Sequence, residues 1–233
     1  MSIYAIGDLH LSFAPGVEKP MDIYGSVWTD HARKLKNNWL ELIRPEDTII
    51  LAGDISWGLK LSEAIPDLEW IDGLPGKKVI FKGNHDLWWS GIGKLNSLYD
   101  SIRFVQNTSY EAEGYFLCGS RGWICPGNDD FTGQDEKIYK RELLRLDMSL
   151  EDARSKGAKD NIIGVLHYPP SAGPSAGSGF TEAFAQAGVR QVVYGHLHGQ
   201  DAFKNGLQGT YNGVAYRLVS LDYLNCRPVL IKE

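Results

Sequence analysis

Five short, mostly apolar stretches of this chain each end in polar residues that can bind a metal ion. The stretches are residues 2–6, 48–52, 78–82, 161–166 and 191–194. Short apolar runs that stop at glycine or polar residues are typical of buried strands that end in a loop. In open α/β sheets, ligands bind outside the carboxyl ends of the strands. We therefore expect the polar residues that follow these stretches to share one site.

Two amphipathic helices are predicted between the strands. Residues 32–42 carry apolar side chains three and four positions apart, which is the spacing of one helix face. A longer stripe of the same kind covers residues 139–153. Within it, Ser149 and Asp152 resemble a capping box, which predicts that this helix breaks in two.

Strands that alternate with helices in the first hundred residues favour an α/β sheet. Further strands are predicted around 102–105, 115–119, 121–124, 214–220 and 228–232. No long helices separate them, so they predict a second sheet and a sandwich with helices outside. A chain of 233 residues fits one large domain or at most two small ones, and we expect a single domain over 1–233.

The composition excludes several classes of protein. The net charge of −5 argues against broad nucleic-acid binding, which usually leaves a basic surface. No apolar run approaches the roughly 18 residues that span a bilayer, and the N-terminus lacks the pattern of a signal peptide. The three scattered cysteines are expected to be reduced and mostly buried. Together these features predict a cytoplasmic protein without membrane contact.

The histidines gather at the predicted strand ends. Of the six in the chain, five lie in these motifs: His10, His85, His167, His196 and His198. The sixth, His31, is expected at the surface of a helix. Each motif alone is weakly or moderately specific, and a lone histidine at a strand end is more often structural. Their combination in one chain is much more specific.

The order of these motifs resembles the calcineurin-like metallophosphoesterase superfamily, of the kind found in bacterial-type predicted phosphohydrolases. The motifs are Asp8-x-His10, Gly53-Asp54, Gly83-Asn84-His85-Asp86, His167 and Gly195-His196-x-His198. All five blocks occur in the family order, and no metal-ligand position is substituted. The resemblance implies a four-layer α/β/β/α sandwich of two mixed sheets flanked by helices, with a dinuclear metal site at the strand ends.

The resemblance also implies a ligand set. The first metal would be held by Asp8, His10, Asp54 and His198. The second metal would be held by Asp54, Asn84, His167 and His196. Asp54 would be shared, because the two oxygens of a carboxylate can bridge ions about 4 Å apart. Mixed histidine and carboxylate ligands disfavour Ca²⁺ and Mg²⁺ and suit Mn²⁺, Fe or Zn²⁺.

The family pattern further implies a mechanism. Two divalent ions outweigh the charges of Asp8 and Asp54, so the site would attract an anionic phosphate. A metal-bridging hydroxide would attack phosphorus. His85 would protonate the leaving alkoxide, and Asp86 would orient His85. Two simpler roles stay open, in which His85 only hydrogen-bonds phosphate and Asp86 is a turn residue.

We therefore expect a metal-dependent phosphoesterase that hydrolyses phosphodiester or phosphomonoester bonds of a small substrate. A nuclease with the same chemistry would need a basic groove. A binding or scaffold protein on this fold would be expected to lack ligands or the acid, and all are present. A hydrolase of non-phosphate esters or amides is less favoured, because the site would be positive.

Signals for the substrate itself are weaker. Trp57, Trp88, Trp89 and Tyr168 follow the motifs and could stack on a flat group, although aromatic residues more often pack in cores. Arg121 could clamp phosphate or be a surface charge. The segments 11–30 and 169–180 are rich in glycine, proline or both and could cover the site or be plain connections.

Overall fold

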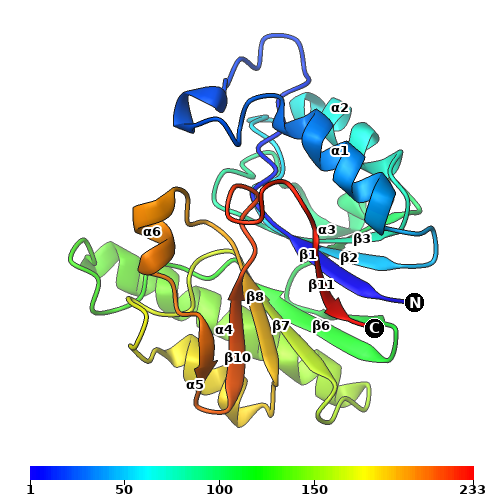
Figure 1. The fold of residues 1–233 in the computed structure, drawn as a ribbon. Coiled ribbons are helices and arrows are strands. Elements are labelled where there is room, and N and C mark those ends of the chain that lie inside the picture. Colours follow the sequence, from blue (N-terminus) through cyan, green and yellow to red (C-terminus); the bar gives the residue numbers. More distant parts are fainter.

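The computed structural model describes residues 1–233 and consists of two β-sheets packed face to face, with helices on the outer faces (Figure 1). In hydrogen-bonded order, the first sheet contains β11 (Val229–Lys232), β1 (Ile3–Ile6), β2 (Thr48–Ala52), β3 (Lys77–Phe81) and β4 (Ile102–Val105). Its strands are parallel except for the edge strand β11.

The second sheet is also mixed. In order it contains β5 (Ser109–Ala112), β6 (Tyr115–Ser120), β7 (Ile162–Leu166), β8 (Gln191–Tyr194), β10 (Val214–Leu218) and β9 (Gly209–Tyr211). The four central strands are parallel, and the two edge strands are antiparallel to their neighbours. The helices are η1 (Asp22–Tyr24), α1 (His31–Leu42), α2 (Leu61–Asp72), α3 (Ile92–Leu95), α4 (Gly133–Ser155), α5 (Gly179–Gln186) and α6 (Gln200–Lys204).

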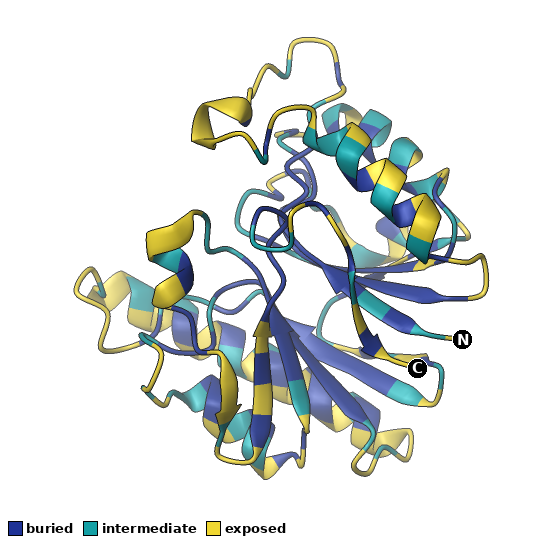
Figure 2. Ribbon diagram, viewed as in Figure 1, coloured by how far each residue is buried: buried dark blue, intermediate teal, exposed yellow.

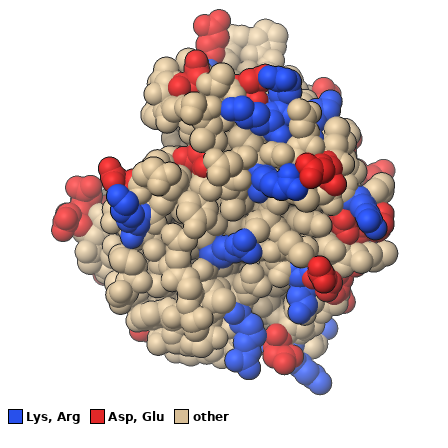
Figure 3. Space-filling model, in the orientation of Figure 1, with Lys and Arg blue, Asp and Glu red and all other residues tan.

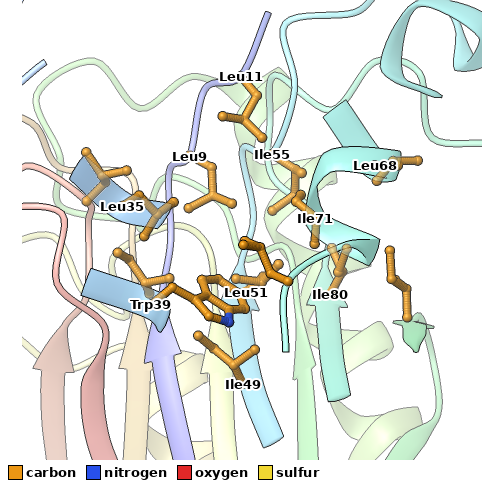
Figure 4. Close-up of a cluster of buried hydrophobic side chains, with 14 of the residues drawn as sticks. Leu9, Leu11, Leu35, Trp39, Ile49, Leu51, Ile55, Leu68, Ile71 and Ile80 are labelled. Atoms are coloured by element: carbon orange, nitrogen blue, oxygen red, sulfur yellow. The ribbon is translucent and has the colours of Figure 1, made fainter. Parts of the chain in front are cut away.

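Three apolar cores separate four layers. One core lies between α1, α2 and the first sheet, where Trp39 packs beside Ile49 and Leu51 (Figure 4). The alternate β2 residues Ile50 and Ala52 face a second core between the sheets. A third core joins the second sheet to α4 and α5. The strands between these cores are buried while the outer helix faces are exposed (Figure 2), which confirms the four-layer α/β/β/α sandwich.

The strand predictions need three corrections. Residues 121–124 form a loop, and β4 and β11 belong to the first sheet. The short edge strands β5 and β9 were not predicted. Both belong to hairpins with two-residue turns, at Glu113-Gly114 and Asn212-Gly213, where all four residues have positive φ. Asn-Gly is a strong hairpin signal, so the second turn was visible in the sequence.

The prediction that the long helix breaks at Ser149 is wrong. α4 continues for 23 residues through this position. The buried Ser149 hydroxyl donates to the Thr108 carbonyl at 2.6 Å and accepts from the Gly119 amide at 3.0 Å. Tertiary contacts therefore satisfy a serine that would otherwise favour a helix end. The capping box of α4 is formed by Thr132 and Asp135.

The cysteines are free and buried, as expected. None of the helices combines the length and the apolar character that crossing a bilayer would require.

Candidate metal centre

Backbone hydrogen bonds join the two sheets where β1, β8 and β10 end. The Gly7 amide donates to the Val219 carbonyl at 2.7 Å, and the Leu221 amide donates to the Gly7 carbonyl at 3.0 Å. The His196 amide donates to both oxygens of Asp8 at 3.0 Å. These bonds bring the motif after β1 against the motif after β8.

A first cluster of metal-capable side chains contains Asp8, His10 and His198. One ligand atom from each lies within 4.8 Å of the others. The Nε2 atoms of His10 and His198 are 3.3 Å apart, and His198 Nε2 is 3.7 Å from Asp8 Oδ1. Asp8 and His10 are buried. The structure therefore brings together three of the four ligands expected for the first metal.

A second cluster contains Asp54, His167 and His196, again with one ligand atom of each within 4.8 Å of the others. Asn84 completes it, because its Oδ1 lies 2.7 Å from His167 Nε2 and 2.9 Å from His196 Nδ1. These are the four residues expected at the second metal.

Asp54 lies between the clusters. Its Oδ2 is 3.4 Å from His167 Nε2 and 3.8 Å from His10 Nε2. Its Oδ1 accepts a hydrogen bond from the His85 amide at 2.8 Å. This placement suits the shared carboxylate of a two-metal site.

The facing atoms of the second cluster fit a cation. His167 Nδ1 lies 3.0 Å from the Ala52 carbonyl oxygen, so in the neutral ring the proton is on Nδ1 and Nε2 carries a lone pair. That lone pair faces Asn84 Oδ1 at 2.7 Å. Two acceptors at this distance need a shared proton or a metal ion between them.

The first cluster repeats this arrangement. His198 Nδ1 lies 3.0 Å from Asp222 Oδ1, and its Nε2 faces His10 Nε2. A histidine that donates one ring N–H to a carboxylate and directs the other nitrogen at a metal is the usual arrangement in metal sites. The donor sets of both clusters therefore fit divalent cations.

The pKa values in the ion-free cluster follow burial and charge. Burial, helped by the nearby His167 charge, lowers the pKa of His196 to about 3, which keeps its ring neutral for ligation. Burial also works against charge on His167, but Asp54 and Asp8 outweigh it and raise the pKa of His167 to about 9. Burial acts to raise the pKa of Asp54, yet His167 holds it well below its usual range. A metal ion would therefore displace a proton from His167.

Four of the expected ligands occupy a backbone conformation that non-glycine residues rarely adopt. The φ angles are 59° at Asp8, 45° at His10, 51° at Asp54 and 73° at His196. Such residues persist only where the surrounding structure holds them, and they concentrate at functional sites. The positive φ angles turn the chain sharply after β1, β2 and β8.

Asp86 was expected to orient His85, but it forms no hydrogen bond with the His85 ring. Its buried carboxylate accepts hydrogen bonds from backbone amides and from one indole. The donors are Gly83 N at 2.7 Å, Ile55 N at 2.8 Å, Asp54 N at 3.0 Å, Trp88 Nε1 at 3.1 Å and Ser56 N at 3.4 Å. This carboxylate therefore ties the loop after β2 to the loop after β3.

His85 is half-buried, and its ring contacts aromatic neighbours. Trp57 lies between two site histidines, with ring centroids 4.4 Å from His85 and 4.7 Å from His10. Burial is the main cause that lowers the pKa of His85. No protein group forms a hydrogen bond with the His85 ring nitrogens, so they are available to a substrate.

The remaining sequence candidates have structural contacts. Tyr168 packs on His196, with centroids 4.1 Å apart. Trp88 and Trp89 pack with Phe104. Arg121 is not free to clamp phosphate, because it pairs with the buried Glu142 at 3.3 Å.

The expectation that His31 is a surface residue is wrong. Its ring nitrogens lie 3.1 Å from the Trp28 carbonyl and 3.0 Å from the Leu9 carbonyl. His31 thus ties α1 to the segment that carries His10. Sequence reasoning missed Asp222, which lies beyond β10 in no recognised motif.

Comparison with known proteins places this geometry in a family. The family model described as calcineurin-like phosphoesterase matches residues 1–200. No curated protein matches the sequence. Among solved structures, phosphopantetheinyl hydrolase from Mycobacterium tuberculosis is similar over 99% of this chain and 95% of its own, with 14% identity and a TM-score of 0.54.

Two further structures have lower TM-scores. A protein of unknown function from Aquifex aeolicus has 16% identity and a TM-score of 0.48, over 98% of this chain and 95% of that one. A 5'-nucleotidase precursor from Thermus thermophilus has 14% identity and a TM-score of 0.36, over 84% and 41%. The family match spans every strand-end motif described above, and we conclude that this chain belongs to the calcineurin-like phosphoesterase family.

Proposed function

We propose that the protein is a dinuclear metal-dependent phosphohydrolase that cleaves phosphodiester or phosphomonoester bonds of a small substrate. The observation that carries the proposal is the pair of ligand clusters on either side of Asp54. The mixed histidine and carboxylate donors favour Mn²⁺, Fe or Zn²⁺.

Each cluster would hold one ion. Asp8, His10 and His198 with Asp54 would bind the first. Asn84, His167 and His196 with Asp54 would bind the second. When bound, the two ions supply Lewis acidity toward phosphoryl oxygens and lower the pKa of water into the neutral range.

The chain's own residues supply positioning and a proton. Asp222 holds the His198 ring, and Asp86 holds the loops that carry Asp54 and Asn84. No protein group accepts from the ring nitrogens of His85, so in its protonated form His85 can donate a proton to the alcohol oxygen of the ester as it leaves. The leaving alkoxide would otherwise be strongly basic, which is why an acid at this position accelerates cleavage.

The surface favours a small substrate over a nucleic-acid polymer. On the face drawn in Figure 3, Lys and Arg are interspersed with Asp and Glu and do not form a continuous basic surface. The net charge of −5 agrees with this distribution. Fold similarity to a phosphopantetheinyl hydrolase is compatible with phosphate-ester chemistry on this scaffold.

The first experiment is an assay of metal-stripped protein, with Mn²⁺ restored, on bis-p-nitrophenyl phosphate and p-nitrophenyl phosphate side by side. We expect turnover to vanish in Asp54→Ala and to fall sharply in His85→Ala. Asp201→Ala is the matched control, because the Asp201 side chain is 99% exposed and outside the site. Preference for the diester would indicate a phosphodiesterase, and preference for the monoester a phosphatase. Failure to bind any metal ion would refute the proposal.

A further inference from the structure

A pocket of about 350 Å³ opens beside His85. One wall is residues 15–19, part of the segment that projects at the top of Figure 1. The opposite wall comes from the loops after β2 and β3 and from the first turn of α2, through Trp57, Leu59, Glu63, His85 and Leu87. We propose that this pocket binds the alcohol portion of the substrate and that this portion is extended and apolar. The inference rests on the proposed phosphohydrolase function.

The pocket adjoins the candidate metal centre through Trp57 and His85. The Trp57 ring stacks on His10 with centroids 4.7 Å apart and also contacts the His85 ring. The same tryptophan lines the pocket. His85 itself lines the pocket. The alcohol oxygen of a bound ester must lie within reach of His85 to receive its proton, so the rest of the alcohol extends into this space.

Four of the ten residues that line the pocket are apolar, and two of these are leucines exposed to solvent. Leu59 is 64% exposed and Leu87 is 62% exposed, and both line the pocket together with Val17 and Trp57. A single exposed leucine is ordinary. Two of them at one pocket beside a candidate acid form an apolar surface that a ligand would remove from water.

The charged side chains of the lining have partners or face solvent. Glu63 Oε2 accepts from the amides of Leu59 at 2.8 Å and Lys60 at 3.3 Å, which caps α2. Lys19 Nζ lies over the Trp57 ring, 5.8 Å from its centroid. Glu18 is exposed to solvent. Glu63 is thus occupied in capping α2, and the two exposed leucines offer the apolar area that an extended alcohol chain would bury.

The test uses two homologous series of probes on the Mn²⁺-loaded protein. Dissociation constants of methyl-, butyl-, hexyl- and octylphosphonate, measured by calorimetry, report binding without turnover. Phosphate release from ethyl, butyl, hexyl and octyl phosphate reports kcat/KM at nearly constant leaving-group basicity. We expect affinity and kcat/KM to rise about two- to fourfold per added methylene, since burying one methylene contributes about 0.8 kcal/mol.

The variant Leu59→Ser/Leu87→Ser should flatten both slopes. Leu144→Ser is the matched control, because Leu144 is 63% exposed on α4, away from the pocket. Both slopes should be unchanged in this control variant. Each slope is taken within one variant, so a general loss of activity does not mimic the result. Equal dissociation constants across the series in the wild type, or an unchanged slope in the double variant, would overturn the inference.

The two proposals can fail separately. If phosphonate affinity rises with chain length but no ester is hydrolysed, the apolar pocket is supported and the phosphohydrolase function is rejected. Hydrolysis of ethyl and octyl phosphate at the same kcat/KM would keep the phosphohydrolase and reject the pocket.

Discussion

The carboxylate of Asp222 holds the ring of His198: Asp222 Oδ1 lies 3.0 Å from His198 Nδ1, and Asp222 Oδ2 accepts from the Gly199 amide at 3.0 Å. Asp222 thus fixes both the tautomer and the orientation of a candidate metal ligand, as well as the backbone that follows it. It is a positioning residue and not itself a ligand.

Replacing Asp222 by alanine should weaken metal binding at the first cluster about 10- to 100-fold. The metal affinity of Asp222→Asn should lie between those of the wild type and Asp222→Ala, because the amide keeps an acceptor but loses the charge. Competition with a fluorescent chelator measures the affinity. Asp201→Asn, in the nearby α6, is the control. Equal affinities in Asp222→Ala and the control would contradict the assigned role.

Asp86→Asn should destabilise the fold, because an amide cannot accept all the N–H groups that now face the carboxylate. We expect a loss of roughly 3 kcal/mol in the free energy of unfolding, measured by urea denaturation of metal-free protein. His85→Ala should cost less than about 1 kcal/mol, since its ring makes no hydrogen bond. Wild-type stability with reduced kcat in Asp86→Asn would instead support pairing with His85.

Gly83→Ala should empty the site of metal. A Cβ atom at this position would overlap the carboxylate and amide nitrogen of Asp54, so the shared ligand would have to move. Metal content after dialysis should fall well below that of Gly91→Ala, where a Cβ meets nothing within 4 Å. Equal metal content in the two variants would show that Asp54 tolerates the shift.

The buried Lys78 should make the free energy of unfolding depend on pH. Its Nζ is buried and donates to the carbonyls of Leu74 at 2.7 Å and Asp72 at 3.2 Å. Burial lowers the pKa of Lys78 from 10.5 to about 8, so between these values the unfolded chain binds more protons than the folded one. The free energy of unfolding should therefore rise with pH across this window.

The size of this effect is limited by the pKa shift. At roughly 1.4 kcal/mol per pKa unit, a shift from 10.5 to about 8 corresponds to at most about 3.5 kcal/mol. Lys78→Met should lack the rise, whereas Lys77→Met, at an exposed neighbour, should keep it. Parallel stability curves for all three proteins would reject the prediction.

The proximity of the candidate ligands could be predicted, because the carboxyl ends of parallel strands meet at one edge of a sheet. Asp8, Asp54 and Asn84 follow neighbouring strands of the first sheet, and His167 and His196 follow neighbouring strands of the second. Each strand and the polar residues after it can be recognised from a short stretch of the sequence. Packing of the two sheets then brings both sets together.

Other features depend on contacts that no local pattern contains. Asp222 is 24 residues from His198 and follows a strand without a motif. Asp86 is adjacent to His85 in sequence, which suggested a pair, but the turn directs its carboxylate to the backbone of both loops. The pocket beside His85 requires residues 15–19 to lie against the loops after β2 and β3.

The positive φ angles of four candidate ligands lower the stability of the fold, yet the site requires these side chains. The four residues are Asp8, His10, Asp54 and His196. Each such conformation costs a non-glycine residue about 1–2 kcal/mol, and glycine would adopt it without that cost. Glycine at any of the four positions would therefore relieve strain and remove a ligand in one step. At Asp8 and Asp54 the same change would also remove the acceptor of the His196 and His85 amides, so the relief of strain would be offset by unsatisfied buried donors.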